Sequence, residues 1–235
     1  MRKAYSIYDN GKYKVCMTGT LWIYDSKEEL VGRFTETPYS YKGAFVPGTN
    51  LFVSRTNECH IVVYDLDKME MVRKIKTSNT DAAESDGFCF SPDGKYFYCI
   101  EAHWNDWLSR QISIYSVPDF ERVKTYFADQ KKIFLEFIES DASGDYYVIG
   151  YDRDGVKTSQ GGVRTLHFTG RLVNGSIVDK REYSDKWLMV TSYFEWKQRN
   201  FTNRNLDGAL KRRGLDKAPV NISIKEFHEK GHLFD

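Results

Sequence analysis

A plan of four β-strands recurs four times along this chain, and the repetition limits the fold more than any other feature of the sequence. The clearest copy, at 87–126, has a short apolar run, a tight turn, an aromatic strand, a loop, and two strands with alternating polar and apolar residues. Its turn places Pro92 at the first corner and Asp93-Gly94 where a positive φ is tolerated. Polarity rises from the first strand to the fourth, which is typical of a propeller blade with its first strand at the axis and its fourth in water.

Three weaker copies of the plan are expected at 3–34, 42–76 and 132–184. In each of the four copies a glycine occupies the turn between the first two strands: Gly11, Gly48, Gly94 and Gly144. A period of roughly 35–50 residues with four strands per unit indicates a propeller or a similar array, so we expect an all-β fold. The expected strands, in chain order, are 4–8, 13–17, 21–24, 30–34, 43–46, 51–54, 61–64, 72–76, 87–90, 96–100, 111–115, 122–126, 133–138, 146–149, 163–168 and 178–183.

Two stretches, SPDGKYFYCI at 91–100 and IVVYDLDKMEMVRKIK at 61–76, resemble the WD40-like β-propeller family in its broad bacterial sense. The resemblance covers about residues 3–184 and implies the propeller fold, but not a function, because these propellers host many roles. The chain lacks the Trp-Asp ending of the third strand and the Gly-His pair of the eukaryotic pattern. Only four copies are clear, and residues 187–196 are expected to add one or two strands that close the ring or begin a fifth blade.

Composition favours a β-rich globular protein with no general attraction to polyanions. The net charge is +1, and aromatic residues make up 15% of the chain. No apolar run approaches the roughly 20 residues of a membrane span, and the first residues lack the apolar core of a signal peptide, so we expect a cytoplasmic protein without a membrane partner. We predict a propeller-like domain at 1–197 and a basic, helical C-terminal extension at 198–235.

The cysteines fit a reducing compartment. Cys16, Cys89 and Cys99 lie in apolar strands and are interpreted as small core residues. A four-residue turn places Cys89 and Cys99 on opposite faces of their sheet, so they should not form a disulfide. Cys59-His60 is expected in a loop, where it could ligate a metal, but no second spaced pair supports such a site. No cofactor is expected.

The loops between second and third strands are expected to share one face of the propeller, and they lengthen along the chain from 18–20 to 55–60, 101–110 and 151–162. Long loops cost little stability and often carry recognition, so this long-loop face is the predicted binding face. Exposed tryptophans there could anchor a partner, although they could equally fold onto the blade edge. The candidate binding residues are His60, Glu101, His103, Trp104, Asp106, Trp107, Asp152 and Asp154.

The same face allows a weaker hypothesis, in which His60, His103 and neighbouring carboxylates hold a divalent metal. The expected first strands are mostly apolar, however, and only the fourth carries a carboxylate, Glu136. Asp152-Arg153-Asp154-Gly155 begins like a calcium loop but lacks the later ligands. No nucleophile elbow, phosphate-binding glycine loop or HExxH motif is present.

The C-terminal extension is basic and should form two short helices. The first is expected at 206–213, and the second should begin at the capping box Ser223–Glu226 and stop near Gly231. The second helix has an apolar stripe that must be buried against the propeller or another molecule. The stripe consists of Ile224, Phe227 and His228. The basic residues Lys211, Arg212 and Arg213 could contact phosphates, but no nucleic-acid-reading motif accompanies them, so a nucleic-acid partner is not favoured.

The sequence therefore favours a non-catalytic module that binds a protein or peptide on the long-loop face of a propeller. Two alternatives remain open. One is a metal-dependent hydrolase, lactonase-like by analogy, with its site on the same face. The other is a structural protein that self-associates into a homo-oligomer through its open blades or its tail.

Overall fold

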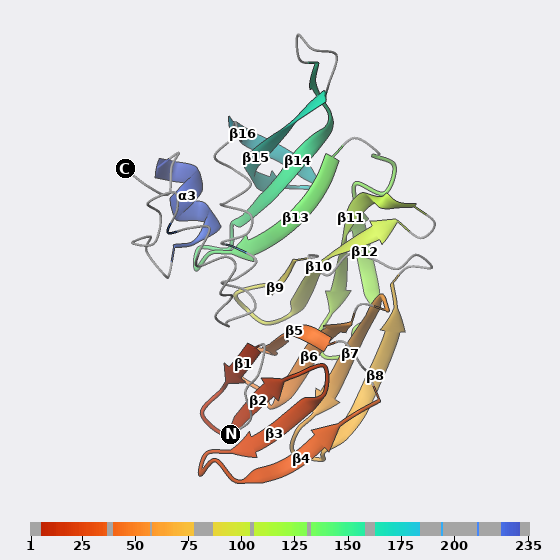
Figure 1. Cartoon of the computed structure of the whole chain (residues 1–235), viewed down its shortest axis with the longest axis vertical. Helices are drawn as coiled ribbons and strands as arrows, with labels where there is room; N and C mark the ends of the chain where they lie inside the picture. Colours follow the sequence, from red (N-terminus) through yellow and green to blue (C-terminus); the bar gives the residue numbers. More distant parts are fainter. Residues whose placement is uncertain are drawn as a thin grey trace.

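The computed structural model describes residues 6–36, 40–56, 58–77, 87–103, 106–130, 133–157, 163–183, 194, 211 and 222–230. Within these residues the chain forms four antiparallel sheets of four strands each, and a short helix near its C-terminus (Figure 1). Each sheet, called a blade below, takes its strands in chain order, so the predicted all-β, propeller-like fold is confirmed. No helix in the described part of the chain is long and apolar enough to cross a membrane.

The strand bounds follow the predicted plan, with extensions at several ends. Blade 1 consists of β1 (Ser6–Asp9), β2 (Tyr13–Met17), β3 (Leu21–Asp25) and β4 (Leu30–Phe34). Blade 2 consists of β5 (Ser40–Phe45), β6 (Leu51–Thr56), β7 (His60–Asp65) and β8 (Glu70–Lys76). Blade 3 consists of β9 (Phe88–Phe90), β10 (Tyr96–His103), β11 (Asp106–Ser116) and β12 (Arg122–Tyr126). Blade 4 consists of β13 (Ile133–Ser140), β14 (Tyr146–Lys157), β15 (Val163–Val173) and β16 (Ser176–Tyr183).

Hydrogen bonds join blades 1 and 2, and also blades 3 and 4, at their first strands. The Gly43 N–H donates to the Tyr8 hydroxyl at 3.1 Å, which joins blades 1 and 2. Between blades 3 and 4, the Gly87 N–H donates to the Glu136 carbonyl at 2.9 Å, and the Ser140 hydroxyl donates to the Phe90 carbonyl at 2.8 Å. The first strands are therefore the inner strands, as the polarity gradient predicts.

Backbone conformation repeats from blade to blade. The predicted turn glycines all have positive φ: Gly11 (87°), Gly48 (71°), Gly94 (70°) and Gly144 (94°). A second position, in the turn between third and fourth strands, has positive φ without glycine: Glu28 (64°), Met69 (54°), Phe120 (52°) and Asn174 (50°). In blades 1 and 2 an aspartate, Asp25 or Asp65, ends the third strand and accepts backbone N–H bonds from this turn. The aspartate therefore stabilises the turn between the third and fourth strands.

Apolar side chains fill the layers between consecutive blades. Representative members of the three layers are Ile23 with Phe52, Val63 with Phe97, and Ile112 with Phe168. Cys89 pairs with Tyr98 and Phe88 with Cys99 across the β9–β10 ladder, which confirms that the two cysteines point to opposite faces. All four cysteines are free; Cys16, Cys59 and Cys99 are buried and Cys89 is half-buried.

Two expectations about connections are wrong. Most of 101–110 is not a loop, because β10 continues to His103 and β11 begins at Asp106; most of 151–157 likewise belongs to β14. Backbone pairing continues there beyond the alternating side-chain pattern.

The second correction concerns the strands expected at 187–196, where the one described residue, Phe194, is helical and buried. An apolar run without a clear period does not distinguish a strand from a buried helix.

The C-terminal helix α3 (Ile224–Lys230) covers blade 4, on the face of a layer that also contains Phe194 and Ile222. Its predicted cap is confirmed, since the Glu226 N–H donates to the Ser223 hydroxyl at 3.0 Å. The predicted stripe of Ile224, Phe227 and His228 is buried. The residues that it meets on blade 4 include Phe137, Tyr147, Ile149 and Tyr183. The stripe is therefore buried against the chain's own last blade.

Polar contacts fix the position of α3 on the blade. The Ile224 N–H donates to Glu139 Oε2 at 2.7 Å, and Lys225 Nζ forms an ion pair with Asp141 at 2.6 Å. His228 Nδ1 lies 2.8 Å from the Thr169 hydroxyl.

The division of the chain into a propeller-like domain and an extension at residue 197 stays a prediction. In the first predicted helix the structure describes only Lys211, which is helical and exposed.

Replacing Gly87 with Ala should destabilise the protein through the inner strands. A Cβ at Gly87 would lie 2.7 Å from the Phe137 Cα and 2.9 Å from the Glu136 carbonyl oxygen, and neither backbone atom can move alone. Overpacking of this kind costs about 1–3 kcal/mol of unfolding free energy, which urea titration would measure. The control is Val123→Ala on the exposed β12, expected to change stability by less than about 0.5 kcal/mol. Equal effects of the two substitutions would contradict the close packing.

Acid should weaken the docking of α3 through His228. Burial lowers the pKa of His228 below its ordinary value of 6.5. The charged neighbours act in both directions: Arg181 and Arg171 lower this pKa, whereas Asp179 and Glu229 raise it. Because the net pKa is lowered, the neutral ring contributes stability above about pH 6.5, and this is lost as pH falls through the folded-state pKa.

We therefore expect the melting temperature of the wild type to fall below pH 6.5 more steeply than that of His228→Gln. Glutamine can still hydrogen-bond Thr169 but does not titrate. His167, whose pKa burial lowers to about 4, titrates in both proteins and cancels in the comparison. Parallel profiles of the two proteins would show that the protonation of His228 is not linked to folding.

Candidate functional site

The structure distributes the predicted binding residues among strand ends of blades 2, 3 and 4. His60 begins β7 and is half-buried, and burial lowers its pKa. His103 ends β10, opposite Asp106 at the start of β11, and its Nε2 lies 3.2 Å from the Phe127 carbonyl. Asp152 is half-buried in β14, 4.0 Å from Lys180 Nζ. These residues therefore come from three different blades.

Several of the predicted residues lie partly or wholly outside the description. Trp104 lies outside the described residues, as do Arg212 and Arg213 of the basic segment. For Asp106, Trp107 and Asp154 the backbone lies in a strand, but the side chains lie outside the description. Whether the tryptophans anchor a partner or fold onto a blade therefore stays a prediction.

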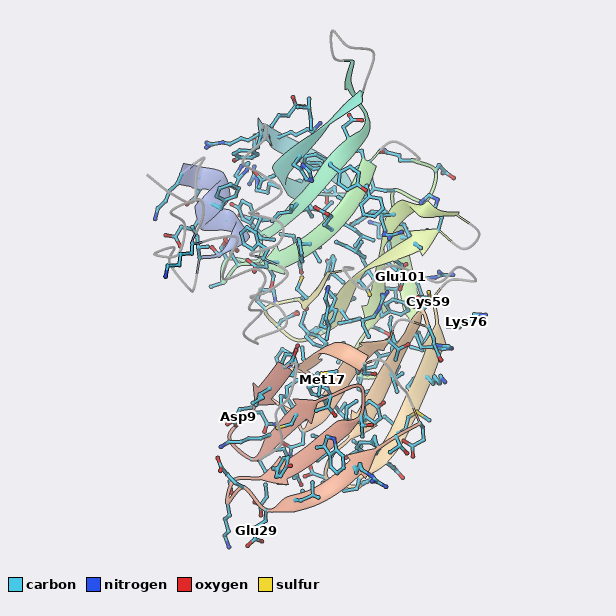
Figure 2. All side chains as sticks on the ribbon, in the orientation of Figure 1. Asp9, Met17, Glu29, Cys59, Lys76 and Glu101 are labelled. Atoms are coloured by element: carbon cyan, nitrogen blue, oxygen red, sulfur yellow. The ribbon has the colours of Figure 1, made fainter. Side chains whose placement is uncertain are left out.

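Glu101 belongs to a buried network between blades 2 and 3, not to a surface loop. Its exposure is 0%, and Figure 2 shows it near Cys59, where these blades meet. It accepts hydrogen bonds from the Ser113 hydroxyl at 2.8 Å and the Tyr115 hydroxyl at 2.7 Å. Burial raises the pKa of Glu101, and the positive charge of Arg55 on β6 opposes that shift. The two hydrogen bonds lie within blade 3, and the charge of Arg55 is the influence on this carboxylate that comes from blade 2.

Burial also keeps the phenol of Tyr115 protonated. Its pKa is raised by desolvation and by the negative charge of Glu101, so the hydroxyl remains a hydrogen-bond donor at physiological pH. On the blade 2 side, Arg55 Nη1 donates to Cys99 Sγ at 2.6 Å and to the Ile100 carbonyl at 3.2 Å. The network thus ties a strand of blade 2 to β10 of blade 3.

No three or more His, Cys, Asp or Glu side chains lie close enough to hold a metal ion within the part of the chain that is described. The described residues therefore offer no third ligand for the metal site hypothesised at His60 and His103. Glu136, the carboxylate expected at the axis, lies at a register shift in β13, and another glutamate, Glu139, faces the central space.

A two-stranded arm extends from blade 4 on the predicted face. Pairing of β13 with β14 ends at Asp152, and pairing of β16 with β15 ends at His167. Beyond these points β14 and β15 continue together, with Val156 opposite Arg164. Figure 1 shows the β14–β15 hairpin reaching beyond the other strands at the top of the view. No other described strand pairs with the edges of this arm.

The corresponding extension of blade 3 is enclosed by its neighbours. Ala102 on β10 packs against Cys59 of blade 2, and both are 1% exposed. Arg110 on β11 is fully buried, with its guanidinium 4.3 Å from the centroid of the Phe134 ring of blade 4. The two extensions therefore differ in their described parts, because that of blade 3 packs against blades 2 and 4 at Ala102 and Arg110.

A cavity of about 250 Å³ lies where the first strands of all four blades meet. Its lining residues are Tyr8 of β1, Lys42, Gly43 and Ala44 of β5, Phe88 and Cys89 of β9, and Ile138, Glu139 and Ser140 of β13. Lys42 is only 4% exposed, and its Nζ lies 5.7 Å from the centroid of the Phe137 ring. The cavity lies toward the ends of β1 and β13 that lead into the tight first turns, away from the arm.

The thiol in this cavity is not an activated nucleophile. Burial raises the pKa of Cys89, and the negative charge of Glu139 raises it further. The thiolate is the reactive form of cysteine, so Cys89 is inert near neutral pH. The cavity therefore has the character of a binding pocket with charged walls, and sequence analysis missed it because the first strands read as apolar.

Comparison with known proteins identifies the fold only. No protein-family model and no curated protein matches the chain. Among solved structures, a chain of hydrazine synthase from Kuenenia stuttgartiensis, which contains a β-propeller, is similar with a TM-score of 0.56 at 16% identity. The similarity covers 77% of this chain and 49% of that one, so this chain spans about half its length. Such a likeness shows a propeller-like fold and no activity.

Removing the Tyr115 hydroxyl should destabilise the buried hydrogen-bond network of blade 3 around Glu101. Tyr115→Phe keeps the buried ring but deprives Glu101 of a donor, at a cost of about 1–3 kcal/mol of unfolding free energy. Urea titration measures the change, and Tyr96→Phe on the exposed end of β10 is the matched control, expected within about 0.5 kcal/mol of wild type. Indistinguishable midpoints for the two variants would show that the hydrogen bond adds nothing.

Proposed function

We propose that this chain is a non-catalytic module that binds a protein or peptide, and that its main contact element is the β14–β15 arm. The observation that carries the proposal is that the arm continues beyond β13 and β16 as a two-stranded ribbon. An isolated two-stranded ribbon is only marginally stable in water. Its edges also present unpaired N–H and C=O groups, which an added strand from a partner can satisfy.

The dimensions of the arm favour a macromolecular partner. From Asp152 to Lys157 the strand rises by about 16 Å, at roughly 3.3 Å per residue. A ligand that contacts both this ribbon and the strand ends of the neighbouring blades must span more than a small molecule does. Asp154 lies on the arm and Asp152 at its base, and the predicted contacts on neighbouring blades are His60, His103 and Asp106.

The repeat plan supports a scaffold role of this kind. The WD40-like proteins that the sequence resembles are propellers in which a rigid set of blades presents variable connections. The chain follows that arrangement, since its blades are joined by buried layers and differ mainly in how far the second and third strands extend. We place the recognition on the blade whose extension is not enclosed by neighbours.

The proposal predicts that trimming the arm abolishes partner binding and leaves the fold intact. Asp152 and Leu166 already face each other, so residues 153–165 can be replaced by Asn-Gly to close a two-residue hairpin. A partner captured by the wild type and then purified should bind the trimmed protein at least about tenfold more weakly in calorimetry, a loss of about 1.4 kcal/mol. The melting temperature should change little, because the blade layers are untouched.

Val123→Thr, on the exposed outer strand β12, is the control and should bind like the wild type. Equal affinity of the trimmed protein would place the interface elsewhere. A captured species that proves to be a second copy of the chain would support self-association in place of the proposed role.

A further inference from the structure

We infer that the central cavity is a binding site for a small zwitterion that carries one carboxylate and one ammonium group, the chemistry of a free amino acid. The inference is independent of the arm, because the cavity lies toward the opposite ends of the first strands. It rests on the placement of one cation and one anion in the walls of the same small cavity.

The cavity contains charges of both signs. Lys42 comes from β5 of blade 2, and Glu139 comes from β13 of blade 4, so the two side chains reach the cavity from different blades. A lysine that is 4% exposed is rare in a protein interior, because removing an ammonium group from water is costly unless other groups interact with it. The Phe137 ring provides one such interaction.

The remaining walls are suited to a small ligand with a short apolar part. Phe88, Ile138 and Ala44 provide apolar surface, and Tyr8 and Ser140 add hydroxyl groups. The volume of about 250 Å³ falls just below the roughly 300–1,000 Å³ of most ligand pockets, so a ligand of few heavy atoms fits. A large side chain, a nucleotide or a folded peptide would not.

The pair of charges selects among small ligands. A simple carboxylate would meet Lys42 favourably but would also face the like charge of Glu139, and a simple amine would have the reverse problem. A zwitterion can direct its carboxylate to Lys42 and its ammonium group to Glu139. Each contact is then a charge-assisted hydrogen bond, the stronger kind in proteins.

Glu139 is oriented before a ligand arrives. Its Oε2 accepts the N–H of Ile224 at 2.7 Å, so helix α3 holds this carboxylate at the wall of the cavity. On the other side, the Tyr8 hydroxyl accepts the Gly43 N–H at 3.1 Å, which fixes the phenol against β5. Groups held in this way lose little freedom on binding, which favours affinity for a small ligand.

The test is a thermal-shift screen of the full chain with each proteinogenic amino acid in turn at millimolar concentration. Acetate and ethylammonium, which carry one of the two charges each, are screened beside them. We expect at least one small amino acid to raise the melting temperature and both single-charge compounds to have a weaker effect. Calorimetry then gives the dissociation constant of the best ligand.

The variants are Lys42→Met, which removes the cation at similar length, and Glu139→Gln, which keeps an acceptor for Ile224. Each should weaken binding by at least about tenfold, because one charged partner of the ligand is lost. Lys95→Met, at a solvent-exposed lysine, is the matched control and should bind like the wild type. If Lys42→Met does not fold, Glu139→Gln carries the same test.

Three outcomes would overturn the inference. The first is that no amino acid stabilises the wild type, as expected if Lys42 and Glu139 simply neutralise each other. The second is an equal response to acetate, which would assign a plain carboxylate site. The third is unchanged affinity in both cavity variants, which would place the ligand elsewhere.

Discussion

The approach of the first strands at the axis is the constraint on which the rest of the structure depends. At Gly87 the backbone of blade 3 comes so close to that of blade 4 that no side chain fits between them, and its N–H bonds directly to the Glu136 carbonyl. Four sheets that meet in this way must splay outward, so each inner strand is crowded and each outer strand reaches water. The gradient of polarity along every repeat is the sequence counterpart of that geometry.

Strands and first turns were predictable because local chemistry determines them. Positive φ at Gly11 and at its three counterparts requires a residue without a Cβ penalty, and alternation marks a strand with one solvated face. The ends of β10 and β14 were not predictable in the same way. There the ladder continues through backbone hydrogen bonds, which leave no pattern in the side chains, and so expected loops proved to be strands.

The site was harder to predict than the fold, because it depends on register. The ladders of β5 and β13 shift at Ser40/Lys42 and at Leu135/Phe137. A shift of one residue changes which side chains face the axis, and the carboxylate that lines the cavity is Glu139, just beyond the first strand expected at 133–138. Glu101 was misplaced for a different reason, since backbone pairing of β10 continues past the strand end predicted at residue 100.

At the blade 4 end of the array, helix α3 has two roles. The outward face of blade 4 is apolar, and among the described residues α3, Phe194 and Ile222 cover it. Because the first N–H of α3 bonds to Glu139, the residue that links cap to blade is also a wall of the cavity. The helix therefore does more than cover apolar surface, since it sets the orientation of a carboxylate that lines the cavity between the inner strands. A helix at this position couples the edge of the array to its centre through a single side chain.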